Sequence, residues 1–186
     1  DSIHYAKRIQ KALLASKEFV DRYIPNNFIY FNPKDIVSGD FYWILHIEDP
    51  SVKKNIFVFA AADCTGHGVP GAFMSLLGIS YLNELVVGQK MKEPDKILNG
   101  LRANIVHALT DNTYEMKDGM DGVLCRFDLR KLQLRYSAAN NGIIIVRDRN
   151  IIELNGDKMD GGVVLGGWRS RGSAWLGRMS ESAMRW

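Results

Sequence analysis

The chain has 186 residues, of which 46% are hydrophobic and 24% are charged. That length can bury one substantial core and is too short to argue for two, so we expect one globular domain. No run approaches the roughly 20 uninterrupted apolar residues that a membrane-spanning helix needs. The first residues also lack the basic-then-apolar layout of a secretory signal. These absences predict a cytoplasmic protein with no membrane segment in this chain.

The net charge of +3 is confined to one end of the sequence. Residues 1–160 hold 20 basic and 20 acidic residues, whereas residues 161–186 hold four Arg and one Glu. A nucleic-acid-binding protein needs a basic stripe, which this neutral body does not show, so we expect no nucleic-acid partner. Cys64 and Cys125 form no Cys-x-x-Cys pair, so neither a zinc site nor a disulfide framework is indicated.

The first predicted element is an amphipathic helix from Ile3 to Val20. Apolar or small residues recur three and four positions apart, with basic residues between them. These positions are Ala6, Ile9, Leu13, Ser16 and Val20. The same spacing is a heptad seam. Two interpretations stay open: a helix packed on its own domain, or the end of a coiled linker from an upstream regulatory module.

Strands are expected next, because β-branched and aromatic residues dominate the following segments. We predict them at Phe28–Phe31 and from Ile36 to Ile47, the second interrupted by Ser38-Gly39-Asp40. The run from Ile56 to Ala62 is continuously apolar, as in a strand buried on both faces. It is followed by Asp63 and a glycine-rich turn.

Two helices and a series of short strands complete the expected elements. Pro70 is well placed as the first residue of a helix, and a second helix is predicted from about Pro94 to Leu109. The strands that follow are predicted at Gly122–Leu129, Leu132–Ala138, Ile143–Arg147 and Asn150–Leu154. Strands, then two helices, then a meander indicate an α+β layered domain.

The last 26 residues differ from the rest of the chain. From Gly161 on there is no helical or strand period, and the segment contains Arg but no Lys, whereas residues 1–160 use twelve Lys and eight Arg. The change indicates either a frameshift, read-through or vector sequence, or a native segment of unusual composition. We therefore divide the chain into a linker or regulatory helix (1–20), a folded domain (21–160) and an atypical tail (161–186).

Two aspartates carry the strongest chemical signal. Asp63 ends an apolar strand and precedes a glycine-rich turn, and Asp40 lies within strand-like sequence after Ser38-Gly39. A carboxylate in such a setting is costly unless a metal ion or backbone donors offset its charge. If the two strands are neighbours, the carboxylates converge, and an all-oxygen ligand set suits Mg²⁺ or Mn²⁺. The competing interpretation is that each Asp is a turn residue or a helix cap.

Several long motifs resemble one protein family. They are Ser2 to Leu14, Pro33 to Trp43, Ala62 to Ser75, Asp118 to Asp121 and Tyr136 to Asn141. In order and spacing they are similar to the SpoIIE branch of the metal-dependent PPM phosphatases, over a stretch from Ser2 to about Met159. The resemblance implies a β-sandwich flanked by helices, two Mn²⁺ or Mg²⁺ ions, and hydrolysis of phosphoserine or phosphothreonine on a bacterial signalling protein.

The resemblance also assigns roles to individual residues. Asp63 matches the aspartate that bridges the two metals, Cys64 matches the residue that lends a backbone carbonyl, and Asp40 matches a ligand acting directly or through water. A metal-activated water would attack phosphorus in line, so no covalent phosphoenzyme is needed. Cys64 follows an acidic residue, which should raise the pKa of its thiol and argues against a cysteine nucleophile.

Weaker assignments concern the surroundings of these ligands. Lys34, Gly66 and His67 are candidates for substrate contact, with an exposed lysine and a turn histidine as the alternatives. Asp118 and Asp121 look ligand-like, but a turn followed by a strand start explains them, and we leave them out of the metal set.

The sequence departs from the family pattern after Met159. A complete member has a further apolar stretch, a Ser/Thr-Asp-Gly motif with a metal aspartate and a closing aspartate, and none is present here. We therefore expect a sandwich that is incomplete at its C-terminal side. Two hypotheses follow: a phosphatase whose opening helix receives signals from an upstream sensor and could form a homodimer, or a catalytically impaired remnant that binds a phosphoprotein.

Overall fold

The computed structural model describes residues 2–49, 54–109, 119–147, 149–156 and 173–175. Its helices are α1 (Ser2–Leu13), α2 (Lys17–Tyr23), α3 (Gly68–Asn83), the π-helical turn η2 (Glu84–Gly88) and α4 (Pro94–Leu109). Its strands are β1 (Phe41–Asp49), β2 (Lys54–Cys64), β3 (Met120–Asp128), β4 (Gln133–Ala139), β5 (Ile143–Arg147), β6 (Asn150–Leu154) and β7 (Ser173–Trp175).

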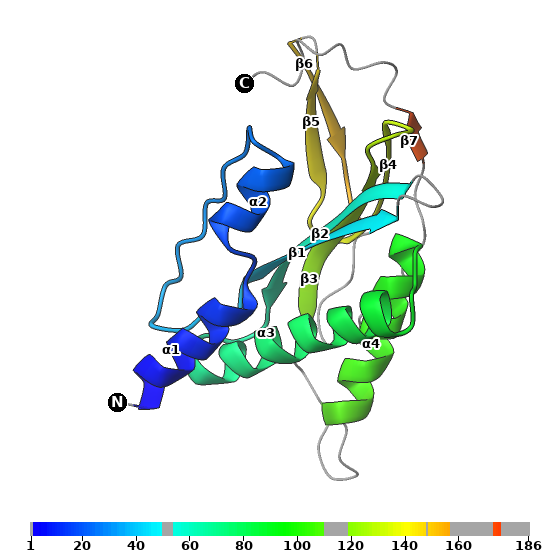
Figure 1. Ribbon diagram of the computed structural model, residues 1–186. Coiled ribbons are helices and arrows are strands. Elements are labelled where there is room, and N and C mark those ends of the chain that lie inside the picture. The colour runs from blue at the N-terminus through cyan, green and yellow to red at the C-terminus, as the bar shows by residue number, and fades with distance from the viewer. Residues whose placement is uncertain (1, 50–53, 110–118, 148, 157–172, 176–186) are drawn as a thin grey trace.

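The described strands form two sheets. The larger has the order β1-β2-β3-β4-β7 and is antiparallel throughout, and β5 pairs with β6 in a separate hairpin. Helices α3 and α4 lie together along one side of the larger sheet, α1 lies against the first half of α3, and the β5–β6 hairpin projects on another side (Figure 1). The predicted α+β class, with a sheet flanked by helices, is confirmed.

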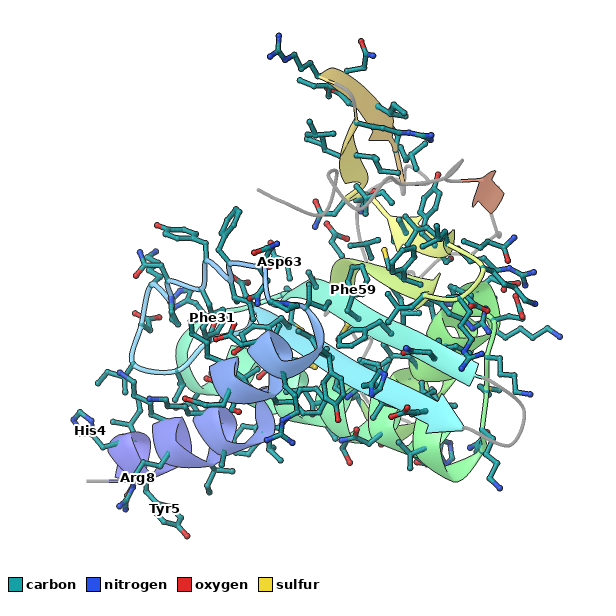
Figure 2. All side chains as sticks on the ribbon, turned by 45° about the horizontal axis from the view of Figure 1, so that its top comes forward. His4, Tyr5, Arg8, Phe31, Phe59 and Asp63 are labelled. Atoms are coloured by element: carbon teal, nitrogen blue, oxygen red, sulfur yellow. The ribbon has the colours of Figure 1, made fainter. Side chains whose placement is uncertain are left out.

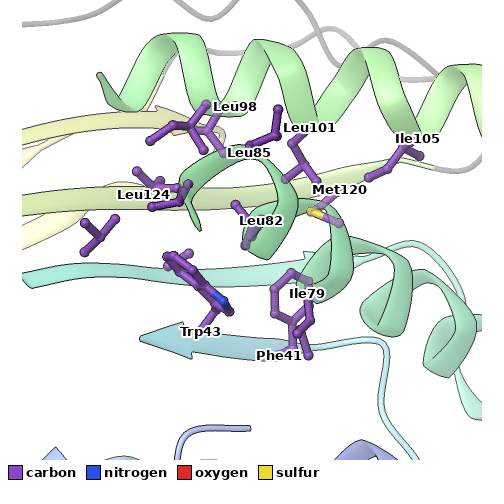
Figure 3. Close-up of a cluster of buried hydrophobic side chains, with 14 of the residues drawn as sticks. Phe41, Trp43, Ile79, Leu82, Leu85, Leu98, Leu101, Ile105, Met120 and Leu124 are labelled. Carbon is purple, nitrogen blue, oxygen red and sulfur yellow. The ribbon is translucent and has the colours of Figure 1, made fainter. Parts of the chain in front are cut away.

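The main core lies between the larger sheet and α3, η2 and α4. Because side chains alternate along a strand, one face of β1 and β2 contributes Phe41, Trp43, Val58 and Ala60 to this layer. Leu124 of β3 is fully buried there. Figure 3 shows Phe41, Trp43 and Leu124 facing leucine and isoleucine residues of the helices. This dry layer accounts for every second residue of the apolar run before Asp63. The expected burial on both faces is wrong at the end of that run, because Ala61 is exposed on the opposite face.

The opposite face of the larger sheet is covered unevenly. Near β3 and β4, a second cluster around Cys125 and Tyr136 is packed by side chains of the β5–β6 hairpin. Farther along β2, Phe59 is half-buried and Ala61 is exposed. Within the described residues, the second layer of the expected sandwich is therefore represented by the hairpin, and part of the β2 face is open.

The prediction of one continuous opening helix is wrong. The chain bends between α1 and α2, where the Ser16 hydroxyl accepts a hydrogen bond from the Phe19 backbone N–H and caps a new helix. The buried side of α1 also differs from the predicted stripe, because Gln10 is buried while Ile9 and Leu13 are 41% and 46% exposed. Helix α1 thus packs on its own domain by one face and leaves a second apolar face uncovered.

The strand predicted at Phe28–Phe31 is also wrong. The segment is not part of a strand, and Phe28 and Tyr30 are 91% and 84% exposed. Aromatic residues favour a strand only where a neighbouring strand is available for pairing. The strand predicted from Ile36 begins instead at Phe41, and the helix predicted from Pro70 begins two residues earlier, at Gly68.

One helical stretch in the described part of the chain passes a simple length and composition test for a membrane span. It is Gly68–Gly88, but half of its most apolar window is buried inside the protein, as in a core helix. Of the tail, residues 173–175 form β7 and pair with β4; the remainder of the predicted atypical segment lies outside the described residues.

Candidate active site

The register of the central strands brings Asp40 and Asp63 together. Phe41 is the partner of Ala62 across the β1–β2 ladder, so Asp40, one residue before β1, lies across from Asp63. The two carboxyl groups lie close enough that, besides partial burial, Asp40 helps to raise the pKa of Asp63. The structure therefore brings together the two side chains that the sequence analysis selected, on the face of the sheet opposite the helices. Figure 2 shows Asp63 near the loop that carries Phe31.

A third carboxylate, that of Asp121, lies on the next strand. Asp121 is the direct partner of Asp63 across the β2–β3 ladder, and its Oδ1 accepts a hydrogen bond of 2.7 Å from the Asn140 side chain. Partial burial, the charge and hydrogen bond of Asp40, and the charge of Asp121 all raise the pKa of Asp63. Like charges facing each other across a ladder are destabilising, so this end of the sheet attracts a cation.

Sequence analysis missed the place of Asp121 beside Asp63. The Asp-Gly-Met-Asp motif was noticed, but a turn explained it equally well, and the register that makes Asp121 the partner of Asp63 is a property of strand pairing. Asp118, the other aspartate of that motif, lies outside the described residues.

Three glycines allow the two motif loops to touch. A Cβ added to Gly39 would lie 2.8 Å from the Gly66 carbonyl oxygen, and one added to Gly71 would lie 2.6 Å from the same atom. Gly66 also has a φ of +91°, a conformation that other residues rarely adopt. The loop before Asp40, the loop after Asp63 and the start of α3 thus pack backbone against backbone, which fixes both aspartates in one place.

Cys64 fits the carbonyl role and not a nucleophilic one. A Cβ on Gly39 would lie 3.0 Å from the Cys64 carbonyl oxygen, so that oxygen faces the turn that carries Asp40. The thiol is buried, and burial followed by the charges of Asp63 and Asp40 raises its pKa to about 12. The predicted elevation of this pKa is confirmed.

The candidate substrate residues have different surroundings. The His67 Nδ1 atom pairs with Asp35 Oδ2 at 3.0 Å, while the His67 side chain is 79% exposed at the start of α3. Lys34 is exposed on the loop beside Asp35. Gly66 belongs to the backbone contact described above. The structure thus joins His67 to the loop that leads to Asp40, and a substrate role for each of the three stays a prediction.

A cleft of about 830 Å³ runs along the open face of the sheet to Asp40 and Asp63. Its walls are the loop from Asn27 to Asn32 on one side and Phe59 and Ala61 of β2 on the other. The carboxylates therefore lie within a largely apolar groove.

The oxygen-rich set of Asp40, Asp63 and the Cys64 carbonyl suits a hard divalent cation. Nevertheless, in the part of the chain that the structure describes, no group of three or more His, Cys, Asp or Glu side chains is arranged to hold a metal ion. The described donors fit the site of one cation and are too few for two.

Comparison with known proteins identifies the family. The model of the stage II sporulation protein E (SpoIIE) family matches residues 54–166, which is more than half of the chain. The chain has the fold of PP2C-type phosphatase domains, and it belongs to the SpoIIE family. Among curated proteins, no match was found.

Solved structures agree with this assignment. The SiaA-PP2C domain of Pseudomonas aeruginosa is 26% identical with a TM-score of 0.77, over 95% of this chain and 67% of that one. The PP2C phosphatase domain of SpoIIE from Bacillus subtilis, with a fragment of its regulatory domain, is 17% identical with a TM-score of 0.55 over 76% of this chain. The RsbU and RsbW domains of a Mycobacterium tuberculosis protein are 18% identical with a TM-score of 0.56 over 77%. This chain spans 39% and 37% of the last two.

The two buried thiols lead to a first prediction. Burial raises the pKa of Cys64 and of Cys125 to about 12, so neither forms appreciable thiolate at neutral pH. Iodoacetamide should leave the native protein unmodified, as measured by intact mass, and should alkylate both cysteines in urea. Rapid modification of Cys64 in the native protein would contradict the burial of its thiol.

A second prediction concerns the carboxylate repulsion. Because the pKa of Asp63 is raised, its ionisation destabilises the fold, and this loss grows as pH rises through the folded-state pKa. In metal-free buffer at neutral pH, Asp63→Asn should stabilise the protein by at most about 1 kcal/mol, since the exposed site is screened by solvent. Urea denaturation measures the difference, which should disappear in acid. A destabilised Asp63→Asn variant would show that no such repulsion exists.

Proposed function

We propose that the protein hydrolyses phosphoserine or phosphothreonine on a signalling protein in a metal-dependent reaction. The observation that carries this proposal is the strand register that places the Asp40 carboxyl group across from that of Asp63 in a SpoIIE-family fold. Two carboxylates held together against their own repulsion favour a divalent cation between them. The phosphatase fold supplies the reaction class.

Asp40, Asp63 and the Cys64 carbonyl would hold Mn²⁺ or Mg²⁺. When bound, such an ion activates water as a nucleophile and offsets charge on the phosphoryl oxygens. The chain's own contribution is to fix the ligands: the contacts among Gly39, Gly66 and Gly71 keep the two aspartates together. Of the weaker candidates, the His67 ring is oriented by Asp35, and Gly66 would let a phosphate approach the backbone closely.

The surroundings of the site support a protein substrate. The cleft that includes the carboxylates is largely apolar, and exposed aromatic residues line its outer wall. Such a groove suits an extended polypeptide better than a small, highly charged phosphate ester.

Regulatory partners are proposed from the relatives and from α1. The similar structures include a SpoIIE fragment with part of its regulatory domain and a protein that contains RsbU and RsbW domains. On α1, Tyr5, Ile9 and Leu13 recur every fourth residue and are exposed, which gives an apolar stripe for an upstream sensor or for a second copy of the chain. We propose a cytoplasmic setting for this signalling role.

The second candidate function is a phosphoprotein-binding module without turnover. The specific observation that favours it is the small number of metal donors among the described residues. A site with one weakly held cation could bind a phosphorylated side chain and still lack the second ion expected in a complete family member.

Hydrolysis of p-nitrophenyl phosphate in the presence of Mn²⁺ distinguishes the two functions. We expect activity that is lost on chelation and that falls by about two orders of magnitude or more in Asp63→Asn. Asp95→Asn, in the first turn of α4, is the matched control and should retain activity. Activity that survives both chelation and Asp63→Asn would rule out the metal assignment, whereas phosphopeptide binding without turnover would favour the binding module.

A further inference from the structure

Gln10 is an unusual residue for a surface helix. It is 4% exposed although the preceding residue of α1, Ile9, is 41% exposed, and buried glutamine is uncommon unless its amide is satisfied. The position therefore calls for partners, and the structure supplies them from two distant parts of the chain.

The Gln10 amide makes three hydrogen bonds. Its Nε2 donates to the Ser38 carbonyl oxygen at 2.6 Å and to Ser75 Oγ at 2.7 Å, and its Oε1 accepts from the Ser38 N–H at 3.0 Å. Ser75 Oγ in turn donates to the Ala72 carbonyl at 2.8 Å. If the amide were flipped, its NH₂ group would face the Ser38 N–H and its oxygen would face the Ser38 carbonyl oxygen. Only one orientation of the Gln10 amide therefore satisfies Ser38.

These bonds hold the turn that carries Asp40. Val37 and Ser38 are buried, Gly39 packs against the Gly66 and Cys64 carbonyl oxygens, and Asp40 follows at once. Ser38 precedes the start of β1, so the ladder does not fix it. Gln10 binds Ser38 on both its N–H and C=O groups and ties it to α3, the helix that begins just after the Asp63 loop.

We propose that Gln10 is a positioning residue of the phosphatase site, which fixes the Ser38-Gly39-Asp40 turn so that the Asp40 carboxyl stays against Asp63. The consequence for catalysis rests on the proposed function. The statement that Gln10 fixes the Ser38-Gly39-Asp40 turn applies to the metal-free protein as well. Because the two carboxylates repel each other, a turn released from Gln10 would move Asp40 away from Asp63 and weaken cation binding.

Hydrogen exchange of the metal-free protein tests the positional statement. Gln10→Met keeps the length and helix preference of the side chain and removes all three bonds. Exchange of the amides from Ser38 to Phe41 should become at least about tenfold faster, while that of β2 and β3 stays within about twofold. Gln89→Met, at an exposed glutamine, should change neither. Equal acceleration in all segments, or none, would overturn the proposal.

Calorimetric titration with Mn²⁺ tests the consequence. In Gln10→Met the affinity should fall about tenfold or more, as it does when an outer partner of a metal ligand is lost, and it should be unchanged in Gln89→Met. An unchanged affinity in folded Gln10→Met would overturn the proposal.

If the wild-type protein binds no Mn²⁺, the metal-dependent function fails and the exchange measurement alone decides the role of Gln10. If Gln10→Met does not fold, Ser75→Ala, which removes one of the three bonds, takes its place in both measurements with the same signs and smaller effects.

Discussion

The candidate site depends on one electrostatic constraint, the closeness of the carboxyl groups of Asp40 and Asp63. Partial burial and the nearby Asp40 raise the pKa of Asp63, and repulsion between the two ionised carboxylates opposes folding unless the backbone around them is held firmly. The strand register places the two residues across from each other, and Gly39, Gly66 and Gly71 allow the loops beside them to pack backbone against backbone. A divalent cation between the two carboxylates would remove this repulsion.

The two faces of the larger sheet have different roles. The face toward α3 and α4 is a dry hydrophobic layer that gives the strands their stability. The other face carries the acids and the cleft, and it includes the exposed Ala61 beside Asp63. Because side chains alternate along β2, Cys64 enters the core while Asp63 points to the open side. One strand therefore contributes both a buried core residue and a carboxylate of the candidate site.

Sequence reasoning was most accurate where local chemistry decides the structure. The bounds of α4, β5 and β6 agree with the predicted ranges, because Pro94 starts the helix and turn residues separate the short strands. The break at Ser16 was missed because a periodic pattern continued across it, and Phe28–Phe31 was wrong because strand preference needs a partner strand. The pair Asp40 and Asp63 was predictable from family motifs, whereas Asp121 and Gln10 were not. Their positions depend on strand register and on contacts with residues distant in sequence.

A crystal structure of the protein grown with Mn²⁺, with anomalous diffraction measured at the manganese edge, tests the central claim most directly. The account predicts an anomalous peak within coordination distance of both the Asp40 and the Asp63 carboxylates. A peak bound elsewhere, or well-ordered density in which these two carboxylates stay in direct contact with no ion between them, would contradict it.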